Sequence, residues 1–241
     1  MKTNKTTAII VAAGQGKRMN SPVAKQFLTL LGRPVLYYSL KAFEKSSVDE
    51  IILVTGNSQV EFCKENIIEK YHINKVSRVI EGGLERYDSV YRALSGMDET
   101  DYVLIHDGAR PFISTELIEK VIKTVIKHKA CIVGTPVKET IKVVSQEGFI
   151  TATPDRDTLW TAQTPQAFVF QSIKKAYEML YMEEGVRRNI TDDAMVYESY
   201  MKDTVMMVPG DYSNLKITTP EDLTLAQVLA EEFWKDTIPN N

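Results

Sequence analysis

Short apolar runs alternate with stretches of helical periodicity through the first half of the chain, and this alternation restricts the possible folds most strongly. Continuous apolar runs of this kind are typical of parallel strands that are buried on both faces of a sheet. Their alternation with helices predicts an α/β fold with a Rossmann-like, doubly wound, mostly parallel sheet, whose ligands bind at the carboxyl ends of the strands. The runs are rich in Ile and Val and are bounded by Gly, Asp or Pro: Thr7–Ala13, Ile51–Thr55, Val76–Ile80, Tyr102–Ile105 and Cys131–Thr135.

The helical stretches between these runs each carry one apolar face, so we expect helices to cover the sheet. Ser114 precedes the third of these stretches and is a candidate N-cap. The three faces are formed by Leu36, Leu40 and Phe43; by Val60, Cys63 and Ile67; and by Leu117, Val121 and Val125.

The pattern changes after Pro136. Residues 137–160 carry short alternating runs with charged residues between them, which predicts a hairpin-like arm and not another buried strand and helix. We expect one domain over residues 1–241, with the arm at about 137–160. The sheet pattern then resumes with a strand at Ala162–Phe168, a helix from Gln171, another helix after Thr191, a strand at Val205–Val208 and a last helix capped by Thr219.

Composition excludes several classes of protein. The 241 residues are 44% hydrophobic and 25% charged, which is typical of a globular chain and not of a disordered one. A formal net charge of −3 argues against a broad electrostatic surface for nucleic acid. The apolar run Ala8–Ala13 is too short for a signal peptide, and no segment approaches the length of a membrane span. We therefore expect a cytoplasmic protein without a nucleic-acid or membrane partner, in which Cys63 and Cys131 are reduced and buried.

The first strand runs directly into the glycine-rich segment Gly14-Gln15-Gly16-Lys17-Arg18-Met19. Glycines let backbone N–H groups approach an anion closely, and a helix that starts after them would add a positive dipole end. A dinucleotide fingerprint would need glycine in place of Met19, and a P-loop would need Ser or Thr in place of Arg18. The segment, with Lys25 soon after it, is therefore either a phosphate-binding loop of another kind or a tight turn with solvated cations.

Two further strands are followed by residues that suit a ligand site. Asp107 comes directly after the strand Tyr102–Ile105, where it could meet Mg²⁺ bound to phosphates or simply form a turn or helix cap. His106 has no paired ligand nearby and is expected to be structural. Gly82-Gly83 follows another strand and opens a helix, so two glycine-rich strand ends in one sheet favour a shared nucleotide pocket.

Several segments in a fixed order carry a resemblance that spans residues 8–223. They are Ala12-Ala13-Gly14-Gln15-Gly16-Lys17-Arg18-Met19, Lys25-Gln26-Phe27, Gly82-Gly83 with Arg86 and Ser89, His106-Asp107-Gly108-Ala109-Arg110-Pro111, Val137-Lys138-Glu139-Thr140-Ile141-Lys142, Leu159-Trp160-Thr161-Ala162-Gln163-Thr164-Pro165-Gln166, Thr191-Asp192-Asp193-Ala194, and Asn214-Leu215-Lys216-Ile217-Thr218. Together they resemble the 2-C-methyl-D-erythritol 4-phosphate cytidylyltransferases of the non-mevalonate isoprenoid pathway. Two departures from that family are Ala24, where a proline usually precedes the lysine, and Leu84, where a polar residue usually follows the glycine pair.

The resemblance implies an enzyme that transfers CMP from CTP to a sugar-alcohol phosphate with Mg²⁺ and releases pyrophosphate. It implies a homodimer in which each arm reaches over the site of its partner. It also assigns roles to individual residues. These are catalysis for Arg18, Lys25, Arg156 and Lys216; CTP binding for Ala13, Gly14, Gly16, Gly83, Arg86 and Ser89; acceptor binding for Arg110, Thr140, Thr164 and Thr191; and metal binding for Asp107.

The chemistry of this reaction agrees with the residue types. The attacking phosphate oxygen is already anionic near neutral pH, because the second pKa of a phosphate monoester is about 6, so no general base is required. The site must instead bring two anions together, for which clustered cations are suited. Two alternatives remain at this point, a ribitol-5-phosphate cytidylyltransferase and a non-catalytic nucleotide-sensing module. Trp160-Thr161-Ala162-Gln163-Thr164 favours the methylerythritol enzymes, and the presence of both Arg18 and Lys25 argues against the module.

Overall fold

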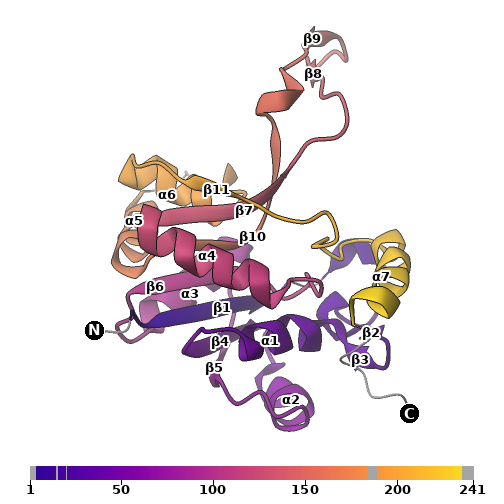
Figure 1. Cartoon of the computed structure of the whole chain (residues 1–241), viewed down its shortest axis with the longest axis vertical. Coiled ribbons are helices and arrows are strands. Elements are labelled where there is room, and N and C mark those ends of the chain that lie inside the picture. The colour runs from indigo at the N-terminus through magenta and orange to yellow at the C-terminus, as the bar shows by residue number, and fades with distance from the viewer. Residues whose placement is uncertain (1–3, 15, 20, 184–188, 235–241) are drawn as a thin grey trace.

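Seven strands form the central sheet of the computed structural model, which describes residues 4–14, 16–19, 21–183 and 189–234 (Figure 1). Their order across the sheet is β11-β7-β10-β6-β1-β4-β5. The predicted α/β fold with a mostly parallel sheet is confirmed. The strands are β1 (Thr6–Ala12), β4 (Glu50–Thr55), β5 (Val76–Glu81), β6 (Tyr102–Asp107), β7 (Ala130–Pro136), β10 (Trp160–Val169) and β11 (Met206–Pro209).

The strand directions explain the apolar runs. β1 lies parallel to both β4 and β6 at the centre of the sheet, and Ala8, Ile9 and Ile10 have no exposed surface. β10 is the exception in direction, because it lies antiparallel between β6 and β7. It inserts there after the chain returns from the arm, so β6 and β7 are not neighbours.

Helices cover both faces of the sheet (Figure 1). One apolar core joins the sheet to α1 (Val35–Lys45), α2 (Val60–Cys63) and α4 (Thr115–His128). It contains the helical faces expected from the sequence except Val60, which is only half-buried, and Ile67 joins it from the π-helix Lys64–Glu69 that follows α2. A second core lies on the opposite face, under α3 (Arg86–Gly96), α5 (Phe170–Met182) and α6 (Asp193–Met201). The predicted cap is confirmed, since the Ser114 side chain accepts a hydrogen bond from the N–H of Leu117.

The segment after the first glycine loop does not form an α-helix, so the prediction that a helix dipole adds positive charge there is wrong. Gly16 has a φ of +64°, and the N–H of Met19 donates to the Gly16 carbonyl, which closes a single 3-10 turn over Lys17–Met19. Met19 is then buried against the C-terminal helix α7 (Pro220–Phe233). A second 3-10 turn follows at Lys25–Phe27, and the first α-helix begins only at Val35. The first glycine segment therefore continues as a 3-10 turn and not as an α-helix with a dipole end.

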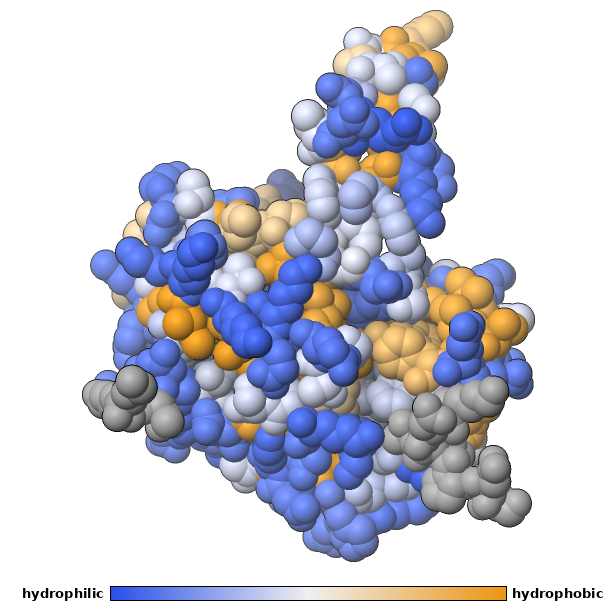
Figure 2. All heavy atoms as spheres, viewed as in Figure 1, coloured by the Kyte–Doolittle hydropathy of each residue, from blue (hydrophilic) through white to orange (hydrophobic). Residues whose placement is uncertain are grey.

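The predicted arm is present as a protrusion that leaves the body between β7 and β10 (Figure 1). Its end is a small hairpin of β8 (Val143–Val144) and β9 (Ile150–Ala152), followed by a 3-10 turn at Arg156–Thr158. Phe149 at the hairpin is 74% exposed. The arm thus carries apolar side chains that the rest of its own described chain does not cover (Figure 2).

The remaining expectations concern α7 and the cysteines. A capping box between Thr219 and Asp222 starts α7, as the sequence predicts, and this helix packs near the short pair β2 (Thr29–Leu30) and β3 (Arg33–Pro34). Cys63 and Cys131 are both buried and free, which confirms that expectation. Across the described ranges, no helix has both the length and the apolar character needed to cross a membrane.

Candidate active site

Two adjoining pockets lie at the carboxyl ends of the central strands. The larger, of about 570 Å³, is lined by both glycine loops, Lys25, Gln26 and Ser89, and the smaller, of about 200 Å³, is lined by residues of β10 and of the segment before α6. Arg86, Asp107 and Lys216 line both. The junction is therefore where two bound molecules would meet.

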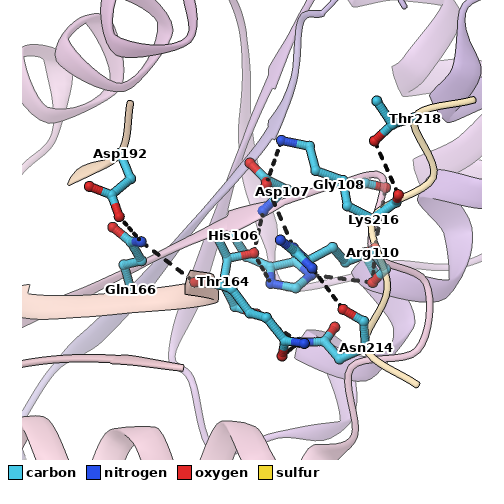
Figure 3. A network of polar contacts seen from close by, with 12 residues as sticks. His106, Asp107, Gly108, Arg110, Thr164, Gln166, Asp192, Asn214, Lys216 and Thr218 are labelled. Atoms are coloured by element: carbon cyan, nitrogen blue, oxygen red, sulfur yellow. Dashed lines mark hydrogen bonds and ion pairs between the residues drawn. The ribbon is translucent and has the colours of Figure 1, made fainter. Parts of the chain in front are cut away.

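Asp107 stands at this junction among the three cations Arg86, Arg110 and Lys216, the last two of which are labelled in Figure 3. Its carboxylate lies 2.8 Å from Nζ of Lys216, 3.0 Å from Nε of Arg86 and 3.7 Å from Nε of Arg110. Burial alone would raise the pKa of Asp107, but the charges of Arg86, Lys216 and Arg110 hold this pKa well below its usual value. The carboxylate is thus ionised and anchored before any ligand arrives.

Arg86 is held from its other side by a second buried carboxylate. Its two terminal nitrogens donate to the two oxygens of Asp193, at 3.0 and 2.8 Å. Tyr177 on α5 donates its hydroxyl to the same carboxylate at 2.6 Å. Burial opposes the charge of Arg86, but Asp193 and Asp107 raise its pKa well above the usual value. The guanidinium therefore remains charged and fixed in place.

β10 supports the junction from below (Figure 3). The Thr164 hydroxyl accepts a hydrogen bond from the Asp107 N–H at 3.0 Å and lies 3.0 Å from Nδ1 of His106. Burial lowers the pKa of His106 to about 3, so this ring is neutral near pH 7. A hydroxyl that accepts from Asp107 is free to donate to an unprotonated Nδ1. His106 thus occupies a structural position and supplies no charge to the pocket.

Arg110 is fixed by the loop that carries Lys216. Nη1 of Arg110 donates to the Asn214 carbonyl at 2.7 Å, and the Asn214 side chain donates to Gln163 and Thr164 of β10. Arg110 is only 8% exposed, yet it lines the smaller pocket. A buried guanidinium at a pocket wall is suited to an anionic ligand.

Lys25 brings a further positive charge to the larger pocket. Burial, followed by the neighbouring charge of Lys216, lowers the pKa of Lys25 to about 8, while Asp107 raises it. Arg18 also acts on this pKa from nearby, although its own side chain is exposed. Ala24 has φ −61° and ψ 138°, which is the backbone that proline would adopt, so this departure from the family pattern leaves the loop path to Lys25 intact.

The second glycine loop forms one wall of the larger pocket. A Cβ on Gly82 would lie 2.4 Å from Cβ of Ala13, and one on Gly83 would lie 2.2 Å from Cβ of Asp88, so neither position has room for a side chain. The Gly83 N–H donates to Oγ of Ser89 at 3.1 Å. Leu84, which follows, is 99% exposed and lines the same pocket. Gly83 lines the larger pocket, so at this position the wall is formed by backbone, and Leu84, Glu85 and Arg86 continue it.

Most of the site residues expected from the sequence come together here. Thr140 and Arg156 do not: both are exposed on the arm and line neither pocket of their own described chain, and Nη1 of Arg156 donates to the Lys138 carbonyl at 3.3 Å. Arg18 is exposed and lines neither pocket, but its charge acts on Lys25, which lines the larger one. The other predicted residues line the pockets: Ala13, Gly14, Gly16, Lys25, Gly83, Arg86, Ser89, Asp107 and Lys216 the larger, and Arg110, Thr164 and Thr191 the smaller.

Sequence reasoning missed the residues that hold the site in place. Asp193, Gln166 and Asn214 belong to segments that carry the family resemblance, but no role follows from their sequence context. Each is buried, and each bonds a group that itself lines a pocket. The only available signal was their position within the resembling segments.

The donor set limits how a metal could bind. No group of three or more His, Cys, Asp or Glu side chains converges anywhere in the described part of the chain. Mg²⁺ is commonly held by one or two carboxylates together with substrate phosphates. Asp107 fits that pattern, because it is an ionised carboxylate at the junction where a triphosphate would supply the other oxygens.

The sheet, the two glycine loops and the cations at the strand ends define the class of nucleotidyltransferases. The family model described as 2-C-methyl-D-erythritol 4-phosphate cytidylyltransferase matches residues 6–232. A protein of that name from Lachnoclostridium phytofermentans is 50% identical over 228 residues, which cover 95% of this chain and 97% of the relative. One from Clostridium botulinum (strain ATCC 19397 / Type A) is 46% identical over 232 residues, covering 95% and 99%. The chain belongs to the 2-C-methyl-D-erythritol 4-phosphate cytidylyltransferase family.

Solved structures agree with this assignment. The 4-diphosphocytidyl-2C-methyl-D-erythritol synthase of Anaerococcus prevotii DSM 20548 superposes with a TM-score of 0.82 at 35% identity, over 95% of this chain and 96% of that one. The Francisella tularensis 2-C-methyl-D-erythritol 4-phosphate cytidylyltransferase gives 0.76 at 30% identity, over 94% and 99%. The resemblance found in the sequence is confirmed over nearly the whole chain, and the protein is an enzyme and not a nucleotide-sensing module.

Proposed function

We propose that CTP occupies the larger pocket and that the phosphate of 2-C-methyl-D-erythritol 4-phosphate occupies the smaller one. As a member of its family, the enzyme transfers the cytidylyl group of CTP to that acceptor in isoprenoid precursor synthesis. The observation that carries the proposal is the junction itself. Asp107 and Lys216 belong to both pockets, so an acceptor phosphate in one would lie next to a triphosphate in the other.

The reaction forms one P–O bond and breaks another. An oxygen of the acceptor phosphate attacks the α-phosphorus of CTP, the bond from that phosphorus to the bridging oxygen breaks, and pyrophosphate leaves with the electron pair. No proton needs to be removed from an oxygen that is already anionic. With a pKa of about 3, His106 beside the junction would be a poor general base, which is consistent with a reaction that requires none. Positioning and positive charge supply the catalysis.

Each cation has a proposed place along the reaction path. Arg18 and Lys25, next to the first glycine loop, stabilise the triphosphate and the charge that develops on it. Lys216 holds the acceptor phosphate at the junction, with Arg110 at the far wall of the smaller pocket. Thr164 and Thr191 line that pocket with hydroxyl groups. The charges that crowd Lys25 would be offset by the phosphates once CTP is bound.

The nucleotide base is proposed to lie against the second glycine loop. Backbone groups of Ala13, Gly14, Gly16 and Gly83 line the pocket, and Ser89 holds the Gly83 N–H. Arg86 lines the pocket but is already bonded to two carboxylates, so its proposed role is to support Asp107 beside the nucleotide.

Mg²⁺ is the proposed cofactor, held by Asp107 together with phosphate oxygens of CTP. When bound, it would neutralise the triphosphate and align the leaving pyrophosphate. A homodimer is proposed as well, in which the partner's arm adds the residues that this arm carries away from its own pockets, Thr140 and Arg156.

The test is a pyrophosphate-release assay with each combination of nucleotide and acceptor. We expect turnover with CTP and 2-C-methyl-D-erythritol 4-phosphate, with Mg²⁺ required. ATP and GTP should be poor donors, because a purine is larger than the single ring of cytosine and would displace the loop at Gly83, which lines the proposed nucleotide pocket. Ribitol 5-phosphate serves as the acceptor control. Comparable turnover with ATP, or with no metal present, would contradict the assigned pockets.

A further inference from the structure

We infer that Asp193 is a positioning residue for the cytidylyl transfer, which acts through Arg86 to fix the Asp107 carboxylate in its orientation toward Mg²⁺-bound CTP. This inference rests on the proposed metal role of Asp107. Asp193 has no exposed surface and lines neither of the two pockets, so it cannot act on a substrate directly.

The contact between Asp193 and Arg86 uses both oxygens of the carboxylate. Oδ1 accepts from Nη1 at 3.0 Å and Oδ2 from Nη2 at 2.8 Å, which makes a two-point contact between planar groups. The Tyr177 hydroxyl donates to Oδ1 from the opposite side at 2.6 Å. Because two of its nitrogens are hydrogen-bonded to one carboxylate, the guanidinium of Arg86 cannot rotate or tilt freely.

The third nitrogen of Arg86 carries this constraint to the site. Nε donates to Oδ1 of Asp107 at 3.0 Å, and in a planar guanidinium the direction of this N–H follows from the position of the other two nitrogens. Oδ2 of Asp107 faces Lys216 at 2.8 Å. Asp193 therefore determines, through one rigid group, which way the Asp107 carboxylate faces.

Asp193 is itself hydrogen-bonded to β10, the strand that also holds the backbone of Asp107. Oε1 of Gln166 on β10 accepts the N–H groups of Asp193 and Ala194, at 3.0 and 2.9 Å. Thr164 on the same strand accepts the Asp107 N–H. β10 therefore fixes Asp107 in two ways. Thr164 holds its backbone directly, and Gln166 holds its side chain through Asp193 and Arg86.

A purely structural ion pair would not need this arrangement. Buried ion pairs contribute little net stability compared with apolar packing of the same volume, so stability alone does not explain two charges in this core. Groups that orient a metal ligand from outside the coordination shell typically change metal affinity or activity by 10–100-fold when they are removed.

The experiment measures binding of the non-reactive analogue α,β-methylene CTP by calorimetry, once with Mg²⁺ and once with EDTA. In Asp193→Asn we expect the gain in affinity due to Mg²⁺ to fall roughly tenfold, with the affinity in EDTA unchanged. Asp49→Asn is the matched control, because Asp49 accepts the Thr6 N–H at the other end of the sheet. It should lower the melting temperature and leave the Mg²⁺ gain intact.

Two results would overturn the inference: an unchanged Mg²⁺ gain in a folded Asp193→Asn, or an equal loss of affinity with and without metal. If Asp193→Asn does not fold, Tyr177→Phe decides, since it removes one hydrogen bond and keeps the charge. The inference then requires a reduction of the Mg²⁺ gain by about threefold, and no change refutes it. Asp107→Asn distinguishes a failure of the proposed metal role from a failure of the inference about Asp193. If Asp107→Asn retains the gain in affinity due to Mg²⁺, the proposed metal role of Asp107 fails. If Asp107→Asn loses this gain while Asp193→Asn keeps it, only the inferred role of Asp193 fails.

Discussion

Lys25 enters a pocket in which Lys216 and Arg18 already contribute positive charge. Burial, together with these neighbouring positive charges, lowers the pKa of Lys25 to about 8. The same crowding is what a triphosphate would relieve, so the residue is unfavourable in the free enzyme and favourable in the complex. A site built for an anion has this property.

Removing either cation beside the first glycine loop should reduce turnover without unfolding the chain. We expect Lys25→Ala and Arg18→Ala each to lower kcat by roughly 10²–10³, the loss typical of one charge-stabilising donor. Lys64→Ala, which removes an exposed partner of Glu61, is the control and should leave kcat unchanged. Steady-state kinetics and melting curves check this. More than a third of normal turnover in either site variant would contradict the assignment.

The pKa of Lys25 also predicts a pH dependence. Lys25 is cationic below about pH 8 and loses its proton as pH rises through that value. Since the charge binds the triphosphate, kcat/KM for CTP should fall above about pH 8, by roughly tenfold per unit. In Lys25→Arg, which stays charged, this decline should disappear. The measurement is a pH profile of kcat/KM for both forms. An identical alkaline decline in Lys25→Arg would assign the titration to another group.

At the scale of elements, the two glycine loops differ in how they are built. The second loop leads into α3, whereas the first closes a 3-10 turn, and Gly14 and Gly16 of the first loop line the larger pocket. The close packing of Gly83 against Asp88 leaves no room for a side chain, even though Gly83 has an ordinary φ. Contact distance, and not backbone conformation, therefore explains glycine at this position.

Gly83→Ala should consequently impair nucleotide binding. The new Cβ would meet the Asp88 side chain at 2.2 Å and its backbone at 3.2 Å, so the loop must move away from the pocket wall. Overpacking of this kind costs about 1–3 kcal/mol, and we expect KM for CTP to rise roughly tenfold or more. Gly96→Ala, in the last turn of the same helix α3, has open space and should leave KM unchanged. Equal KM values for the two variants would show that the loop tolerates the shift.

Elements with a strong local pattern could be predicted from the sequence. The strands, the cap at Ser114 and the cap at Thr219 all follow from residues close together in the chain. The expected burial of Val76–Ile80 on both faces was wrong, because β5 is the edge strand of the sheet and none of its residues is fully buried. The helix expected after Gly16 was wrong, because the burial of Met19 against α7 is a contact between distant segments. The antiparallel position of β10 between β6 and β7 could not be predicted for the same reason. It depends on where the chain re-enters the sheet after the arm, which no local sequence pattern indicates.

The same limit applies to the site. The glycine loops, Lys25 and Asp107 could be predicted because each follows a strand, and strand ends meet at one edge of the sheet. The contact between Arg86 and Asp193 could not be predicted, because the two residues are far apart in the sequence and Asp193 is brought near only when α6 packs beside α5. An acid in the first turn of a helix is otherwise explained by the helix dipole.

At the scale of the whole molecule, the arm is the part that its own chain leaves incomplete. β8 and β9 are both exposed, and Arg156, which follows the hairpin, is exposed and lines neither of the two pockets of its own described chain. Exposed apolar strands are rarely left uncovered. A two-fold dimer in which the arms are exchanged would cover them and would bring Arg156 to the partner's site.

The exchange can be tested by mixing two inactive variants, Lys25→Ala and Arg156→Ala, after unfolding and reassembling them together. If Arg156 acts in the partner's site, a mixed dimer contains one site with both changes and one site with neither. Random assembly makes half of the dimers mixed, so about a quarter of all sites should regain full activity. Each variant refolded alone is the control and should stay inactive. If every arm served its own subunit, each site would keep one change, and the mixture would remain as inactive as its components.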